Sequence, residues 1–173
     1  LTEPNHGSDA TYMETTAVRD GDGWVINGMK RWNTGVHTAT HDIIFARTSG
    51  EPGQGSGITA FLVPTSDPGF EVEFYWWTLN MPSDHAEVRL TDVRVGDDAV
   101  FGDVGRGLEL AQHFVHENRI RQAASSLGAG QYCVDTAVTY ARERITWGKP
   151  LAVNQGIQFP LVELHTEAAM LRQ

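Results

Sequence analysis

The sequence predicts an α+β chain in which an antiparallel sheet is followed by long helices. At least six strand-like segments precede residue 102 with no helical pattern between them, which is typical of an antiparallel barrel or sandwich. From Leu108 onward, apolar residues recur at steps of three and four, as they do on one face of a helix. We therefore expect two domains, 1–102 and 103–173, divided within the glycine-rich segment 102–107.

The segment 24–34 carries the strongest local signal in the sequence. Asn27-Gly28 lies between two runs of strand-forming residues, which favours a two-residue type I′ hairpin. In that hairpin Ile26 would pair with Met29, Val25 with Lys30 and Trp24 with Arg31.

Three polar and aromatic residues follow this predicted turn. The period of two along a strand would place Lys30, Trp32 and Thr34 on one face. A flat aromatic ring with a hydroxyl two residues later suits a planar heterocycle that has a hydrogen-bonding edge. The alternative is a Trp packed in a sheet core, with Thr34 beside it for its strand propensity.

The other predicted strands are bounded by turn signals. Pro64 stops one of them because proline cannot donate to a ladder. In the last strand the apolar residues change from even-numbered positions (Ala86, Val88, Leu90) to odd-numbered ones (Val93, Val95), which indicates a β-bulge near Thr91-Asp92. A turn is expected at 20–23, an exposed loop at 49–57 and another turn at 67–69. The remaining strands are expected at 11–19, 42–48, 58–63, 70–77 and 86–95.

The helical part is expected to contain one long helix and the start of a second. Small residues at 123–130 would let another helix approach closely, for example across a subunit interface. Gly148-Lys-Pro150 would end the first helix, and Asn154 is the expected N-cap of a second helix that runs to the end of the sequence.

The composition argues against several classes of protein. A net charge of −9 disfavours nucleic acid or an anionic membrane as the partner. Cys133 is the single cysteine, so a reducing compartment is expected, namely the cytoplasm or, in a eukaryote, the mitochondrial matrix. No apolar run reaches the length of a membrane span. Because the sequence starts without Met and stops inside a helical pattern, we expect a piece of a longer protein.

Two weaker patterns carry no predicted site. The glycines at 102, 105 and 107 have the wrong spacing for a dinucleotide-binding loop and follow an antiparallel strand. His113 and His116 share a helix face, but no cysteine or carboxylate cluster of suitable spacing joins them, so no metal site is expected.

Three segments, in this order, resemble motifs of the acyl-CoA dehydrogenase family. Segment 1–9, LTEPNHGSD, is similar to the family's T-E-x-x-x-G-S-D loop. Segment 24–34 is similar to its N-G-x-K-x-W-x-T motif, and segment 142–150, RERITWGKP, to its R-x-[TA]-[FW]-G-K-P motif. The resemblance covers essentially the whole chain, which is similar to only part of a family member.

This resemblance implies a small orthogonal β-barrel that binds FAD. Thr2 would lie beside the pyrimidine end of the flavin, Trp32 would pack against the isoalloxazine, and the Thr34 hydroxyl would bond to flavin N5, which receives hydride. An apolar side chain against one face of the ring and a hydrogen-bond donor at N5 meet the needs of a flavin in any protein. Ser8 would contact the CoA part of the substrate, although Gly-Ser-Asp is also ordinary turn chemistry.

The resemblance also assigns residues near the second helix to the cofactor. Arg144, Thr146, Trp147 and Gln155 match positions that reach the adenosine and pyrophosphate of FAD bound mainly by a neighbouring subunit. The arginine fork suits pyrophosphate because it donates two hydrogen bonds at once. The alternative is an arginine on a solvated helix face and a Trp that closes a helix end.

The catalytic base remains unknown. Arg119 matches an arginine near the thioester, but the preceding position, where some family members carry a catalytic Glu, holds Asn118. Glu117 points to another face of the helix. We therefore expect the base to lie outside this sequence. Segment 81–85 also departs from the family pattern Gly-x-Arg-x-Ser, which weakens any assignment of the acyl chain.

By resemblance, the expected function is that of a segment of an FAD-dependent acyl-CoA dehydrogenase, which forms a trans-2-enoyl-CoA. The expected partners are an acyl-CoA, an electron-transfer partner and the other subunits of a homodimer or homotetramer. One alternative is an acyl-CoA oxidase or flavin monooxygenase on the same scaffold. Another is a non-catalytic β-barrel module whose helices serve only oligomerisation.

Overall fold

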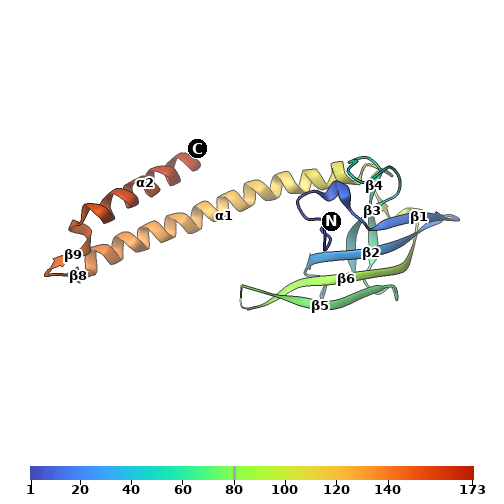
Figure 1. Ribbon diagram of the computed structural model, residues 1–173, viewed down its shortest axis with the longest axis horizontal. Helices are drawn as coiled ribbons and strands as arrows, with labels where there is room; N and C mark the ends of the chain where they lie inside the picture. Colours follow the sequence, from blue (N-terminus) through green and yellow to red (C-terminus); the bar gives the residue numbers. More distant parts are fainter. Residues whose placement is uncertain (80) are drawn as a thin grey trace. The chain divides into compact units, whose positions relative to one another are not determined.

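A computed structural model describes residues 1–79 and 81–173 (Figure 1). The chain divides into two compact units, Leu1–His113 and Phe114–Gln173, each of which is described by itself. We call them the sheet unit and the helical unit. Helix α1 (Gly107–Glu143) begins in the first and continues in the second.

The sheet unit contains one seven-stranded sheet with the order β5-β6-β2-β1-β3-β4-β7. In Figure 1, β3 and β4 run crosswise to β2, β5 and β6. The strands are β1 (Thr16–Asp20), β2 (Gly23–Thr34), β3 (His41–Arg47), β4 (Ile58–Pro64), β5 (Phe70–Thr78), β6 (Met81–Gly96) and β7 (Val100–Phe101).

The α+β class is confirmed, but the expectation of a closed, wholly antiparallel barrel is wrong. Strands β5 and β7 end the sheet order and do not pair with each other. Strand β7 has only two residues, too few to extend the ladder far. Strands β1 and β3 are parallel, through the pair Thr16–Arg47, because the chain reverses twice between them. All other neighbouring strands are antiparallel.

The predicted hairpin at Asn27-Gly28 is also wrong. Strand β2 runs straight through these residues and pairs with β1 on one side and β6 on the other. The hairpin lies earlier, where Asp20 pairs with Gly23 across the predicted turn. Gly21 there has a φ of 60°, as the first central residue of a type II′ turn requires.

Other structural needs explain Asn27 and Gly28. The Asn27 amide donates to Asp92 Oδ1 (3.1 Å), and its oxygen accepts from the Asp92 N–H (2.9 Å). A Cβ on Gly28 would come within 2.7 Å of Thr15 Cα, so only glycine fits against that neighbour. Asp92 has a φ of 51° and lies where β6 has one residue more than β2, which confirms the predicted bulge.

The first predicted strand begins later than expected. Asp9 accepts from the Thr11 N–H (3.1 Å) and caps the short 3-10 helix η1 (Ala10–Tyr12), so β1 starts only at Thr16. The predicted strands at 42–48, 58–63, 70–77 and 86–95 are confirmed within a few residues, as is the loop at 49–57. A second 3-10 helix, η2 (Asp97–Ala99), precedes β7.

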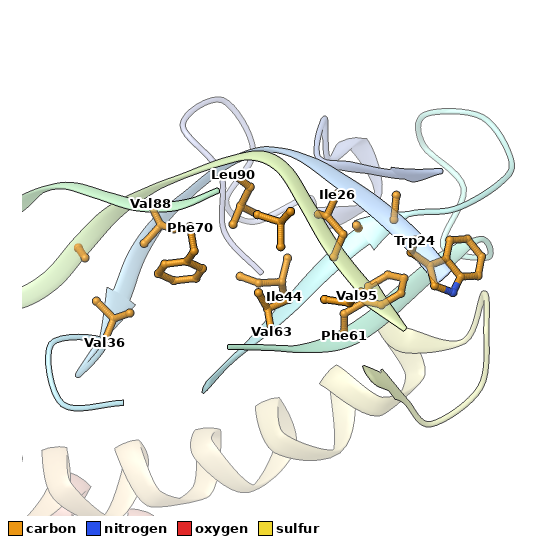
Figure 2. Close-up of a cluster of buried hydrophobic side chains, with 14 residues drawn as sticks. Trp24, Ile26, Val36, Ile44, Phe61, Val63, Phe70, Val88, Leu90 and Val95 are labelled. Atoms are coloured by element: carbon orange, nitrogen blue, oxygen red, sulfur yellow. The ribbon is translucent and has the colours of Figure 1, made fainter. Parts of the chain in front are cut away.

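The main core lies between the crossing strands of the folded sheet. In Figure 2, Ile44, Phe61 and Val63 of β3 and β4 lie opposite Ile26 and Leu90 of β2 and β6. Full burial of such a side chain stabilises the fold by about 1.5–3 kcal/mol. The core consists of Ala17, Trp24, Ile26, Val36, Ile44, Ala46, Phe61, Val63, Phe70, Ala86, Val88, Leu90, Val93 and Val95.

A smaller core anchors the start of α1 to the sheet. Ala111 packs with Met13, Phe45, Ile58 and Ala60. A Cβ on Gly107 would approach the Ala60 nitrogen to 2.6 Å, so the helix begins with glycine where it crosses β4.

The helical unit follows the predicted pattern. The short strands β8 (Ile145–Thr146) and β9 (Lys149–Pro150) and the 3-10 helix η3 (Leu151–Val153) separate α1 from α2 (Gln155–Leu171). The Asn154 side chain accepts from the Gly156 N–H (2.9 Å), which confirms the predicted N-cap. No helix in the described parts of the chain is both long and apolar enough to cross a membrane.

Candidate functional site

The end of β2 carries a second bulge at a predicted site residue. The register shifts between Arg31 and Asn33, and Trp32 between them has a φ of 67°. One inserted residue reverses the alternation of a strand. Lys30 therefore lies opposite the buried Val88, whereas Thr34 lies opposite His85, so the prediction that Lys30, Trp32 and Thr34 share one face is wrong.

The structure brings Trp32 and Thr34 together on an exposed part of the sheet unit. The Trp32 side chain is 42% exposed, and its ring lies 4.8 Å from the Trp76 ring, tilted by 39°. His85 lies edge-on to Trp32 at 6.4 Å, and its Nδ1 lies 2.8 Å from the Thr34 hydroxyl. An exposed ring beside a fixed hydroxyl can hold a planar heterocycle by stacking and one hydrogen bond.

Trp76 is fixed behind Trp32 by an ion pair. Arg31 donates twice to Glu87, from Nε (2.8 Å) and Nη2 (3.0 Å), and its guanidinium lies 4.8 Å from the Trp76 ring centre. The Trp76 indole N–H also donates to Glu87 (3.0 Å). The Arg31 hydrogen bond lowers the pKa of the Glu87 carboxyl, so this buried group is ionised at neutral pH.

A buried ion pair ties the N-terminal loop to the same strand. Glu3 Oε1 lies 2.7 Å from Lys30 Nζ, and both side chains are almost fully buried. Glu3 also accepts from the backbone N–H groups of Glu14 and Thr15. The Arg31 N–H donates to the Thr2 carbonyl (2.9 Å), so predicted residue Thr2 lies along the strand segment that carries Trp32.

The environment of this pair shifts both pKa values. Burial by itself would raise the pKa of Glu3, but the charge and hydrogen bond of Lys30, together with the backbone donors, lower it below its ordinary value. Burial lowers the pKa of Lys30 against the opposing charge of Glu3. The carboxylate form of Glu3 therefore depends on its fixed partners.

Ser8 lies in the exposed part of the N-terminal loop, directly before the capping residue Asp9. Both the turn interpretation and the substrate interpretation of Ser8 are compatible with this place. Its predicted contact with CoA stays a prediction.

The four residues predicted to reach a partner's cofactor lie around the α1–α2 connection of the helical unit. Arg144 directly follows α1, and its carbonyl accepts from the Leu151 N–H (2.7 Å). Thr146 pairs with Lys149 across a two-residue turn. Trp147 (φ 47°) and Gly148 (φ 75°) form this turn, with both φ values positive as in type I′.

This turn exposes Trp147 almost completely, at 98%. Arg144 is exposed too, and Gln155 is the exposed first residue of α2. This exposure is compatible both with the cofactor interpretation and with the alternative of a Trp that closes a helix end.

Arg119 lies exposed on α1 within the helical unit, one residue after Asn118. The Asn118 oxygen accepts from Arg121 (2.5 Å), so it is engaged within the helix. Within residues 1–79 and 81–173, no group of three potential metal ligands comes together.

Trp76, His85 and Glu87 are residues of this site that reasoning from the sequence missed. The sequence predicted a strand at 70–77, but nothing local indicated that β5 would bring Trp76 beside Trp32 or that β6 would bring His85 opposite Thr34. The pairing depends on the bulge at Trp32, which shifts the register by one residue.

Comparison with known proteins identifies relatives over both units. Residues 1–93 match the family described as acyl-CoA dehydrogenase, middle domain, and residues 105–173 match acyl-CoA dehydrogenase, C-terminal domain. The human mitochondrial short-chain specific acyl-CoA dehydrogenase is 37% identical over 172 residues, which cover 95% of this chain and 40% of that protein. A probable acyl-CoA dehydrogenase of Bacillus subtilis is 36% identical over 174 residues, which cover 100% of this chain and 46% of that protein.

Solved structures agree with these matches. Butyryl-CoA dehydrogenase from Megasphaera elsdenii superposes with a TM-score of 0.88 at 31% identity, over 99% of this chain and 45% of that one. A glutaryl-CoA dehydrogenase, solved as its glutaryl-CoA complex, gives a TM-score of 0.86 at 29% identity, over 99% of this chain and 44% of that one. The chain thus spans less than half the length of these relatives. The chain belongs to the acyl-CoA dehydrogenase family.

Proposed function

We propose that this chain is a segment of an FAD-dependent acyl-CoA dehydrogenase, with a middle domain at 1–102 and the first C-terminal helices at 103–173. The complete enzyme converts an acyl-CoA thioester to a trans-2-enoyl-CoA. The observation that carries the proposal is the fixed pair of Trp32 and Thr34 on an exposed surface, within a chain that matches both domains of the family.

The residues of the sheet unit fit the flavin part of FAD. Trp32 offers an exposed ring, Thr34 a hydroxyl beside it, and Thr2 a loop held along the same strand. In this proposal Trp32 packs against the isoalloxazine and Thr34 donates to N5, while Thr2 lies at the pyrimidine end. Bound FAD supplies the acceptor for the hydride that leaves the β-carbon.

The residues of the helical unit fit the other end of FAD. Arg144 is exposed beside the β8–β9 hairpin, and Thr146, Trp147 and Gln155 follow it along the α1–α2 connection. We assign these four residues to the adenosine and pyrophosphate of FAD held mainly by a second subunit. The proposed enzyme is therefore a homodimer or homotetramer.

The acyl-CoA would contact Ser8 and Arg119. Arg119 lies near the thioester in this proposal, and neighbouring Asn118 cannot act as a base because an amide does not accept a proton at neutral pH. The base that removes the α-proton therefore belongs to a part of the enzyme outside this sequence. An electron-transfer partner would reoxidise the flavin.

The first test measures FAD in the full-length protein. Purified protein should be yellow, and an acyl-CoA should bleach its visible flavin band in the absence of oxygen. Trp32→Ala should loosen FAD, since stacking contributes about 0.5–1.5 kcal/mol beyond the buried area. Trp77→Ala, which removes another exposed Trp from β5, is the control and should retain FAD.

The outcomes separate the rival functions. Rapid consumption of oxygen by the bleached protein would favour an oxidase or monooxygenase. A colourless protein that takes up no FAD would leave only a binding or oligomerisation module.

A second test concerns binding across subunits. Arg144→Ala should weaken FAD by about 1.5–3 kcal/mol through loss of a charge-assisted contact. Arg142→Ala, two residues earlier and also exposed, should have a much smaller effect. FAD binding should also fall when the protein is diluted below the dissociation constant of its subunits. A monomer that keeps its FAD would refute the arrangement.

A further inference from the structure

His85 is held opposite Thr34 by the strand ladder. Thr34 and His85 are directly paired residues of β2 and β6, and the hydroxyl and Nδ1 lie 2.8 Å apart. The Gly35 N–H donates to the Asp84 carbonyl (3.1 Å), and the Ser83 hydroxyl donates to the Trp76 carbonyl (2.6 Å). Segment 83–85 is thereby bonded to the residue after β2 on one side and to β5 on the other, so the backbone that carries the imidazole is held in place.

The Thr34 hydroxyl has a single proton and more than one possible acceptor. It lies 3.3 Å from the Trp32 carbonyl and 2.8 Å from His85 Nδ1. An imidazole nitrogen can either donate or accept, depending on its tautomer. His85 Nδ1 is the nearer of the two neighbours of the hydroxyl, and it also lies 3.4 Å from Asp84 Oδ1.

A hydrogen-bond partner at flavin N5 must serve two states of that atom. N5 accepts a hydrogen bond when the flavin is oxidised and carries a hydrogen when the flavin is reduced. A hydroxyl that donates to N5 in the first state and accepts from it in the second needs a neighbour that donates to the hydroxyl in the first state and accepts its proton in the second. Imidazole meets this need, since protonated Nδ1 donates to the hydroxyl and bare Nδ1 accepts from it.

We propose that His85 is a positioning residue that orients the Thr34 hydroxyl toward flavin N5 in both redox states. The inference rests on the proposed function, because it takes the Thr34 contact with N5 from there. His85 lies within the segment 81–85, where this chain departs from the common family pattern. The departure thus coincides with a specific contact to a site residue.

The test measures the flavin midpoint potential in the FAD-bound, full-length protein. His85→Phe keeps a ring beside Trp32 but leaves the hydroxyl proton only the more distant Trp32 carbonyl as an acceptor when the flavin is reduced, and the loss of the better partner has a cost. The equilibrium should shift about tenfold toward oxidised flavin, which is about 30 mV for a two-electron couple. In the Thr34→Val background, His85→Phe should cause no further shift, because His85 then has no hydroxyl to orient.

The control is His41→Phe. The Nδ1 of His41 lies 3.1 Å from the Thr40 hydroxyl at another exposed place in the same sheet unit, so it matches the contact chemically. This variant should leave the potential unchanged. An unchanged potential in His85→Phe, or an equal shift with and without the Thr34 hydroxyl, would overturn the proposal.

A readout without cofactor keeps this inference separate from the proposed function. In FAD-free protein, the ¹⁵N NMR shift of His85 Nδ1 should move in Thr34→Val and stay constant in Thr38→Val. If the ¹⁵N shift of His85 Nδ1 is the same in Thr34→Val as in the unchanged protein, the contact itself is refuted. A protein that shows the NMR effect but binds no FAD would refute the proposed function and, with it, the role of His85 at N5.

Discussion

The sheet unit and the helical unit bury their apolar residues to very different extents. The sheet unit encloses two clusters of apolar side chains, several of them fully buried. In the helical unit, among the residues that the structure describes, only Val134, Ala141 and Ala168 are buried apolar residues. Large side chains of both helices are exposed, including Phe114, Ile120, Tyr132, Tyr140, Phe159, Val162, Leu164, Met170 and Leu171.

This contrast shows that the two units differ in what specifies their structure. The sheet unit holds its own core, so its fold depends on its own side chains. The helices present apolar faces that are stable in water only when other protein surface covers them. Substitutions should therefore act on stability in the sheet unit and on association in the helical unit.

The largest effect should come from the sheet core. Phe61→Ala removes a fully buried ring that touches Trp24 edge-on at 5.5 Å, and should lower the free energy of unfolding by about 3–5 kcal/mol. Urea denaturation, monitored by tryptophan fluorescence, measures this free energy of unfolding. Phe159→Ala, in which an exposed ring of α2 is lost, should change the same quantity by less than about 0.5 kcal/mol. Equal losses in the two variants would remove the contrast between the units.

The next effect should come from the buried ion pair. Lys30→Met leaves Glu3 buried without its partner and should cost about 3–5 kcal/mol of unfolding free energy. The double variant with Glu3→Gln should recover part of this loss, because no uncompensated charge remains. Arg19→Ala breaks the exposed pair with Asp97 and should cost less than about 1 kcal/mol. Additive losses from Lys30→Met and Glu3→Gln would mean that the pair does not act as a unit.

Acid should destabilise the sheet unit through Glu3 and Glu87. The folded state lowers the pKa of both carboxyls below the unfolded value of 4.5, so their stabilising contribution is complete above that pH and is lost as pH falls through the folded values. Urea midpoints measured from pH 7 to pH 3 should fall most steeply below pH 4.5. The double variant Glu3→Gln with Lys30→Met should show a shallower fall, and an unchanged slope would exclude Glu3 as a contributor.

The smallest effect should come from the glycines inside α1. An added Cβ at Gly128 or Gly130 would meet nothing within 4 Å in this chain, so Ala there should raise helix stability by about 0.4–1 kcal/mol each. If the small residues at 123–130 face a second subunit, the same changes should weaken association of the full-length protein. Circular dichroism and sedimentation measure the two quantities separately, and tighter association in the Ala variants would exclude this face as a close contact.

The sequence allowed most elements to be predicted where one local rule dominates. Asn154 caps α2 as expected, Asp20 to Gly23 form a turn, and the parity change in β6 revealed its bulge at Asp92. Each of these features depends on a few neighbouring residues. The local chemistry alone was therefore sufficient.

The failures share a different cause, namely contacts with distant strands. Asn27-Gly28 has the composition of a hairpin turn, but pairing with Asp92 and the close approach of Thr15 make it the interior of β2. The barrel expectation failed for a similar reason, since the parallel β1–β3 pair depends on chain reversals far apart in sequence. The bulge at Trp32 likewise required knowledge of the partner strand, and without it His85 could not be placed in the site.

Trp147 gives the helical unit an intrinsic optical probe. Its indole projects almost entirely into water from the β8–β9 turn, whereas Trp24 is buried in the sheet core. Its emission should lie near the red limit for tryptophan, and acrylamide should quench it readily. If the proposed second subunit or its adenosine covers this ring, the emission should shift to the blue and quenching should weaken. The proposed assembly could thus be followed through Trp147 without any added label, once the emission of the other exposed tryptophans, Trp32 and Trp77, is accounted for.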